Sequence, residues 1–128
     1  MTTTRSPLTP RRWLLIDAAG AAVSVVLLGF VLPAFEPLFG IPLPALYTLA
    51  VIPAGFLCID LLSFFFWRGD ARRPLRFIAI CNQLYCLAAL GFAFYHAGAL
   101  TVWGWLYICA DVSLVALIAA VELRVALR

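Results

Sequence analysis

Acidic and amide side chains lie inside long apolar stretches of this 128-residue chain, where they could hold protons, form hydrogen bonds or bind cations. Asp17, Asp60 and Asp111 each stand within such a stretch, and Asn82 and Gln83 stand side by side in another. A carboxyl group at the centre of a membrane helix costs about 2.5–3.5 kcal/mol on insertion scales, so it normally faces the protein interior. Without a basic partner it must hold a proton, accept hydrogen bonds or bind a cation. These five residues are therefore the candidate buried polar or proton site.

Four apolar segments must position these side chains, because crossing a hydrocarbon core of ~30 Å takes about 20 mostly apolar residues in a helix. The segments are residues 13–32, 46–67, 75–95 and 100–121. The chain is 66% hydrophobic and 12% charged, with a mean hydropathy of +1.07, whereas a soluble domain is about 45–50% apolar. We therefore predict an all-α membrane protein that folds as a four-transmembrane-helix antiparallel bundle. Residues 1–12 are expected to form a flexible polar tail, and residues 13–128 a single transmembrane domain.

The basic residues are all arginines, and they occur only before the first segment, between the second and third, and after the fourth. Basic residues near membrane spans are retained in the cytoplasm, so this pattern predicts that both termini are cytoplasmic. The arginines of the central connection are candidate contacts for anionic lipid headgroups, which attract each basic residue by about 1 kcal/mol. They are Arg68, Arg72, Arg73 and Arg76. Because topology explains the arginines, nucleic acid is not an expected partner.

The depths and helical faces of the polar residues indicate how they could meet. Asp17, Asp60 and Asn82 lie at similar depths in the cytoplasmic half, so they could form one polar layer if the helices pack antiparallel. Asp111 lies deeper, and we expect hydrogen bonds to it from groups such as Asn82, Gln83 or Tyr107. Two helical stripes support inward faces: Asp17, Gly20, Ala21 and Ser24 on the first segment, and Tyr107, Asp111, Val115, Ile118 and Glu122 on the fourth. We interpret the first stripe as a small-residue face that allows close helix packing.

Signals for a cofactor or a catalytic centre are weak in this sequence. The four cysteines form no Cys-x-x-Cys pair, unlike those of four-helix quinone-linked thiol oxidases, and a single His provides at most one imidazole. Nucleophile elbows and phosphate-binding glycine loops do not occur. We therefore expect no catalytic residue, no metal and no cofactor, and the chain is not expected to be an enzyme.

Several short motifs resemble small uncharacterised four-span integral membrane proteins of bacteria. They lie at residues 16–21, 39–42, 79–86 and 103–105, so the resemblance spans nearly the whole chain. It implies a compact four-helix bundle in the bacterial cytoplasmic (inner) membrane. It indicates no particular activity, because the proteins of this group are uncharacterised. Small multidrug transporters are similar in architecture alone, since their essential carboxylate is a Glu in the first helix.

The leading functional hypothesis is a non-enzymatic integral membrane protein, either a structural or an accessory subunit that binds a partner. The expected partners are membrane lipids and either a second copy of the chain or another membrane protein. The alternative is a small proton- or cation-coupled transporter that uses the membrane carboxylates. A lipid- or quinone-modifying membrane enzyme is a third hypothesis, because the Asp residues could act as acid–base groups.

Overall fold

The computed structural model describes residues 9–127, and every regular element within that range is a helix. Four helical segments are long and apolar enough to cross a membrane: Pro10–Ala34, Leu43–Phe66, Arg72–Tyr95 and Val102–Ala126. The prediction of an all-helical chain with four candidate membrane spans is confirmed. Residues 1–8 of the predicted polar tail lie outside the described residues. The last three residues of that tail, 10–12, belong to the first helix.

The first span is a helix that widens near its end. It consists of α1 (Pro10–Val26), a π-helical turn η1 (Leu27–Val31) and α2 (Leu32–Ala34). Thr9 caps its start, because the Thr9 side chain accepts a hydrogen bond from the Arg12 amide at 3.2 Å. Pro33 lacks an amide hydrogen and its ring excludes the carbonyl four residues earlier, which disfavours a regular α-helical turn there. The Leu32 amide accordingly bonds to the carbonyl of Leu27, five residues back.

The other helices are the short α3 (Glu36–Phe39) and three long ones, α4 (Leu43–Phe66), α5 (Arg72–Tyr95) and α6 (Val102–Ala126). Helix α5 begins three residues before the predicted position; its N-cap residue Ala71 makes no side-chain capping bond, and the Asp70 side chain just before it accepts a hydrogen bond from the Arg72 amide at 3.0 Å. Helix α6 continues five residues beyond its predicted end at 121. This extension places Glu122, which the predicted inward-facing stripe of the fourth segment already included, within the last span.

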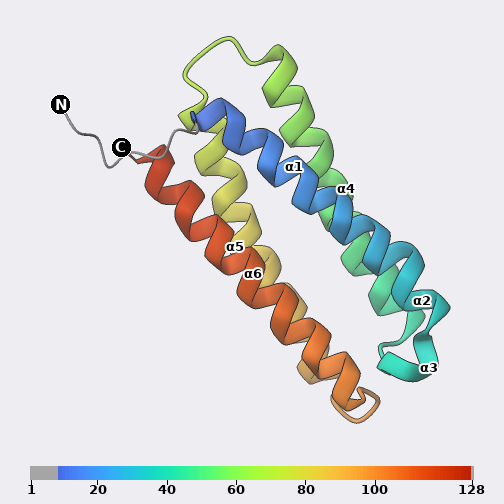
Figure 1. Cartoon of the computed structure of the whole chain (residues 1–128). Helices are drawn as coiled ribbons and strands as arrows, with labels where there is room; N and C mark the ends of the chain where they lie inside the picture. The colour runs from blue at the N-terminus through green and yellow to red at the C-terminus, as the bar shows by residue number, and fades with distance from the viewer. Residues whose placement is uncertain (1–8, 128) are drawn as a thin grey trace.

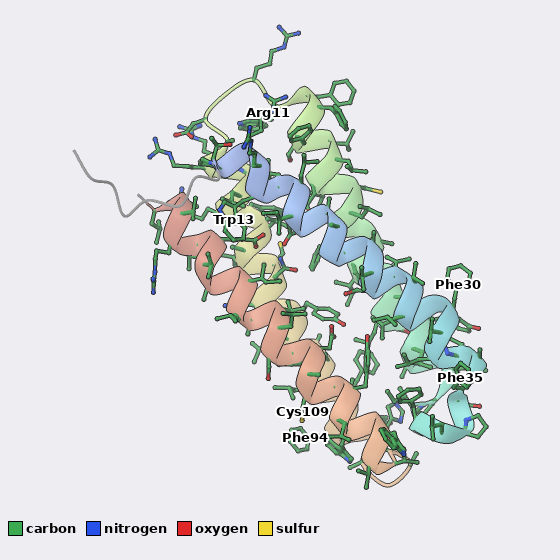
Figure 2. The ribbon with its side chains drawn as sticks, in the orientation of Figure 1. Arg11, Trp13, Phe30, Phe35, Phe94 and Cys109 are labelled. Carbon is green, nitrogen blue, oxygen red and sulfur yellow. The ribbon has the colours of Figure 1, made fainter. Side chains whose placement is uncertain are left out.

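The long helices lie as two pairs, α1 with α4 and α5 with α6, and contacts between the pairs are much less extensive (Figure 1). Two apolar cores join the pairs at opposite ends of the bundle. The core near the 67–71 connection is built around Leu14, Leu75 and Val125. The core near the other two connections is built around Leu28, Leu46, Ile108 and further buried residues. Large apolar side chains on the outer faces point away from the bundle, as Phe30 and Phe94 do in Figure 2.

The end of the bundle that carries the 35–42 and 96–101 connections, here called the loop end, is tightly latched. The Thr101 hydroxyl donates to the Leu38 carbonyl at 2.5 Å, and the Thr101 amide donates to the Phe39 carbonyl at 3.2 Å. Two glycines make this approach possible. A Cβ on Gly40, whose φ is +71°, would lie 2.2 Å from the Ala99 carbonyl oxygen, and one on Gly104 would lie 2.1 Å from that of Phe39.

The opposite end, here called the arginine end, carries the 67–71 connection, the start of α1 and the end of α6. Arg11 lies over the Phe64 ring, 4.8 Å from its centroid, a cation–π arrangement that links α1 to α4. Arg72 forms an ion pair with Asp70 at 2.9 Å. Both side chains of that pair are close to half exposed, so we expect it to contribute little to the stability of the fold.

Candidate functional site

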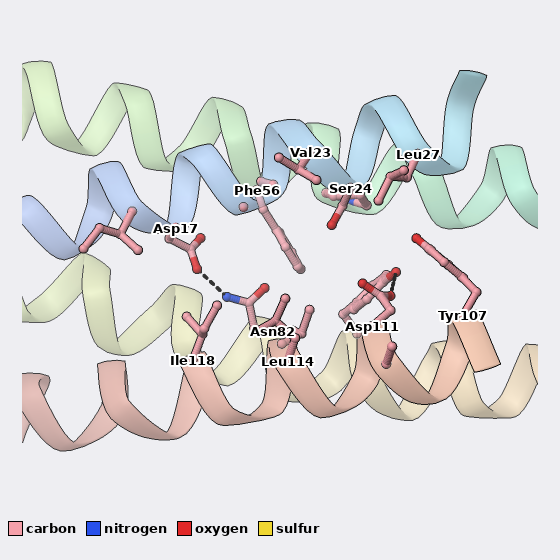
Figure 3. Close-up of a pocket in the computed structure, with 17 residues that line it drawn as sticks. Asp17, Val23, Ser24, Leu27, Phe56, Asn82, Tyr107, Asp111, Leu114 and Ile118 are labelled. Carbon is pink, nitrogen blue, oxygen red and sulfur yellow. Dashed lines mark hydrogen bonds between the residues drawn. The ribbon is translucent and has the colours of Figure 1, made fainter. Parts of the chain in front are cut away.

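A cavity of about 420 Å³ separates the two helix pairs between the two apolar cores (Figure 3). On the first span the lining residues lie between positions 16 and 27, and on α6 between positions 107 and 118. Pro53 and Phe56 of α4 and Asn82 and Tyr85 of α5 complete the wall. Leu14 and Leu28 belong to the cores on either side of this stretch of the first span. The cavity therefore lies midway along the spans, at the depth of the hydrocarbon core in a spanning arrangement.

The small-residue stripe of α1 lines this cavity. Gly20 and Ala21 both contribute to the wall, and a Cβ added to Gly20 would meet nothing within 4 Å. At Gly20 our interpretation of the stripe as a close helix contact is therefore wrong, because the absent side chain leaves open space at the cavity wall, whereas Ala21 is buried.

The cavity opens sideways between α1 and α6. Gly20 and Val23 of α1 line it and are nevertheless exposed, as are Ala110 and Leu114 of α6. Residues that both line a cavity and remain accessible mark its mouth. In a membrane-spanning protein this mouth faces lipid, so a molecule dissolved in the bilayer could enter without crossing an aqueous phase.

Polar groups converge near the middle of the cavity, in what we call the Asp111 site: Ser24, Tyr85, Tyr107 and Asp111. The Tyr85 hydroxyl donates to Asp111 Oδ2 at 2.8 Å. In Figure 3 the side chains of Ser24, Tyr107 and Asp111 point into the same space. The buried Tyr107 hydroxyl has no hydrogen-bond partner among residues 9–127. The site therefore combines a carboxylate, an unsatisfied phenol and an alcohol inside an otherwise apolar wall.

A second polar group lies toward the arginine end and draws one residue from each long helix: Asp17, Asp60, Asn82 and Glu122, here called the polar cluster. Asn82 Nδ2 donates to Asp17 Oδ1 at 2.8 Å across the two helix pairs. Asp60 and Glu122 are fully buried and each interacts electrostatically with Asp17. Within the described residues no hydrogen bond of good geometry reaches their carboxyl oxygens, which lie close enough to Asp17 to hydrogen-bond with it when one of the carboxyl groups holds a proton. Like charges repel strongly in a low-dielectric interior, so the cluster is stable when its carboxyl groups share protons.

The structure thus brings Asp17, Asp60 and Asn82 together at one depth, as their positions along the helices had indicated. Asp111 lies apart from them in the other half of the cavity wall. Its partner is Tyr85, and not Asn82, Gln83 or Tyr107 as expected. Gln83 lines no part of the cavity and donates weakly to the Ala116 carbonyl at 3.4 Å.

One member of these sites, Tyr85, was missed by the reasoning from sequence. Glu122 was placed on the inward-facing stripe of the fourth segment, eleven residues after Asp111, but was not included among the candidate site residues; it is fully buried. For Tyr85 the signal is its position three residues after Asn82, which places both side chains on one side of α5.

The predicted lipid-contacting arginines lie at the arginine end and are all exposed. Arg72, Arg73 and Arg76 surround a small depression together with Asp70 and Ala126, whereas Arg68 lies in the connection outside it. The side-chain hydrogen bond from Arg72 holds the pKa of Asp70 below its ordinary value. Three arginines around one depression are suited to an anionic headgroup, although Asp70 already engages one of them.

Comparison with known proteins found no match to a family model, a curated protein or a solved structure. The resemblance to small four-span bacterial membrane proteins accordingly stays a prediction.

Proposed function

We propose that this chain is a multi-pass membrane protein that binds an apolar ligand, taken up sideways from the bilayer, in the cavity between its two helix pairs. The observation that supports this most directly is the cavity itself. Its volume of about 420 Å³ lies within the range of roughly 300–1,000 Å³ that is typical of small-molecule sites. Its apolar wall with a few convergent polar groups is also typical of such sites.

Binding without catalysis fits the lining better than an enzyme does. The wall contains two carboxyl groups but neither Cys nor His, and Ser24 has no basic group beside it that could activate its hydroxyl. This proposal retains the leading hypothesis of a non-enzymatic membrane protein and gives it a ligand.

We further propose an antiparallel bundle with both termini cytoplasmic, in the inner membrane of a bacterium. The support is that the described arginines gather at one end of the bundle, as the distribution of basic residues around cytoplasmic connections requires. Fusing a reporter that is active only in the cytoplasm to each terminus tests this topology. Activity from both fusions supports it, and silence from either one contradicts it.

The ligand hypothesis is tested by native mass spectrometry of protein extracted gently from its own membrane. Gly20→Phe adds an aromatic ring at the cavity wall, and the new Cβ meets no atom within 4 Å. Gly91→Phe is the matched control, since Gly91 has equal room but is exposed on α5 and does not line the cavity. We expect a bound small molecule in the wild type and in Gly91→Phe, and its loss in Gly20→Phe. A bare wild-type protein, or equal retention in both variants, would contradict the proposal.

A second candidate function is proton-coupled transport, which is favoured by the presence of carboxyl groups along the cavity wall. Asp17 and Asp111 line the same space at different depths, so a proton could be exchanged at either place as a ligand moves. Proton flux into liposomes distinguishes transport from binding. Transport predicts a ligand-dependent flux that Asp111→Asn abolishes, whereas binding alone predicts no flux in either protein.

The native mass spectra would also reveal a stoichiometric protein partner, which is the outcome that the accessory-subunit hypothesis requires.

A further inference from the structure

We infer that the ligand of the cavity is an amphipathic cation, held with its charged group at the Asp111 site. This inference rests on the proposed ligand-binding function and specifies the chemical class of the ligand.

The carboxylate of Asp111 is only partly engaged by the protein. Its Oδ2 atom accepts a hydrogen bond from Tyr85 at 2.8 Å. Among residues 9–127 no hydrogen bond reaches its Oδ1 atom, and that atom is not fully enclosed. Asp111 therefore presents an acceptor oxygen to the cavity, beside the unpartnered hydroxyl of Tyr107.

The charge of the lining selects the sign of the ligand. Asp17 and Asp111 line the cavity, and no Lys, Arg or His does. Asp17 shares protons within the polar cluster, so Asp111 decides the sign of the ligand: when ionised, it repels an anionic group and stabilises a cation at low dielectric. A neutral ligand could satisfy the free oxygen of Asp111 only by donating a hydrogen bond, without the added attraction between opposite charges.

Aromatic rings around Asp111 add a second preference for positive charge. Phe56, Tyr85 and Tyr107 all line the cavity, and Phe56 meets Tyr85 edge to face with ring centroids 6.5 Å apart. Ring faces attract cations that lie within about 6 Å of the centroid, including quaternary ones that cannot donate hydrogen bonds. The sideways opening onto lipid selects the remaining property, because a ligand that enters there must also be soluble in the bilayer.

The inference is tested with two hydrophobic ions of the same shape and opposite charge, tetraphenylphosphonium and tetraphenylborate. Equilibrium dialysis measures the binding of each to the full chain in lipid nanodiscs, with empty nanodiscs subtracted. We expect saturable binding of the phosphonium to the wild type and to Gly91→Phe, and a loss of at least tenfold in affinity in Gly20→Phe. Asp111→Asn should lose at least tenfold as well, while Asp17→Asn, at the far end of the cavity, should lose less than threefold.

A pH titration of the wild type keeps the test independent of whether Asp111→Asn folds. The titratable groups around Asp111 are Tyr85 and Cys86 of α5 and Tyr107 of its own helix, with Asp17 of α1 farther along the cavity. Helix α4 contributes the uncharged Phe56. Since a proton and the cation compete for one carboxylate, phosphonium affinity should fall as the pH is lowered. Affinity independent of pH between 4 and 9, or of Asp111→Asn, would overturn the inference.

The two proposals fail in different ways. If the phosphonium does not bind, or binds equally to Gly20→Phe, the cation inference is wrong. If a lipid retained from the native membrane is nevertheless displaced by Gly20→Phe, the ligand-binding function stands. If neither molecule responds to Gly20→Phe, both proposals are wrong.

Discussion

The close contact between α3 and the start of α6 at the loop end leads to a specific prediction, because there is no room for a single added methyl group at Gly104. In Gly104→Ala the new Cβ would lie 2.1 Å from the Phe39 carbonyl oxygen, whereas real Cβ contacts under 3.0 Å essentially never occur. The obstacle is backbone, so it cannot rotate away as a side chain could. Helices α3 and α6 must therefore separate by about 1 Å, close to the minimum that van der Waals contact requires.

The cost of this separation follows from the contacts that it breaks. Two hydrogen bonds, from the hydroxyl and the amide of Thr101 to the carbonyls of Leu38 and Phe39, hold α3 in place. Each contributes about 0.5–1.5 kcal/mol net, and resisting the separation by overpacking would cost a similar total of about 1–3 kcal/mol. Alanine is the better helix former by about 1 kcal/mol, which offsets part of the loss. We expect the free energy of unfolding to fall by up to about 2 kcal/mol.

The control for this variant is Gly91→Ala, because a Cβ there meets nothing within 4 Å and only the gain in helix propensity remains. The two substitutions should therefore change stability in opposite directions. Thermal unfolding followed by circular dichroism in a mild detergent measures both. If Gly104→Ala melts at or above the wild-type temperature, the close approach of α3 to α6 is refuted. Because Phe39 also contacts the Tyr107 ring, the same variant should weaken ligand retention in the cavity.

Three further outcomes are expected. Asp60→Asn keeps the shape of the side chain and adds an N–H donor to a cluster of unsatisfied oxygens, so unfolding in detergent should show a gain of up to about 1 kcal/mol; a clear loss would contradict the arrangement of the polar cluster. Tyr85→Phe removes the hydrogen bond to Asp111 and keeps the ring in the cavity wall. It should cost about 0.6–1.7 kcal/mol, and a double-mutant cycle with Asp111→Asn should recover that energy as coupling. Arg72→Gln should move the titration midpoint of Asp70 upward in carbon NMR spectra. The lowered pKa of Asp70 means that its interaction with Arg72 is present at neutral pH and is lost as the pH falls through that lowered pKa, and an unmoved midpoint would refute it.

Hydropathy was sufficient to predict the four spans, because the hydrocarbon core imposes the same length on every helix that crosses it. The ends of the helices were harder to predict, since they depend on local hydrogen bonds. Thr9 caps α1 ahead of the apolar run, and α5 also begins before its apolar run, where Asp70 accepts a hydrogen bond from the Arg72 amide. The end of α6 was also predicted too early, at residue 121, although Glu122 had been placed on the inward-facing stripe of that helix and is buried.

The candidate site could be predicted only in part, because the sequence of one helix does not specify how that helix is rotated against its neighbours or how far it lies from them. Depth along each helix was enough to bring Asp17 and Asn82 to one level, and they are hydrogen-bonded. The partner of Asp111 depends on how α5 is rotated against α6, which a single helix does not encode. The meaning of Gly20 and Ala21 depends on whether the facing helix is close. A stripe of small residues is compatible with a tight contact and with a cavity, and composition does not distinguish the two.

The location of the cavity follows from where the helix pairs are joined. At the arginine end Asp17 bonds to Asn82 from one pair to the other, within a cluster to which all four long helices contribute. At the loop end α3, which follows the first span, is latched to the start of α6. Each join is accompanied by an apolar core, and the cavity lies between the two, with residues of the cores and the Asp17–Asn82 pair at its borders. The pairs can therefore part in the middle without losing either attachment, and that is where Asp111 and the lateral opening lie.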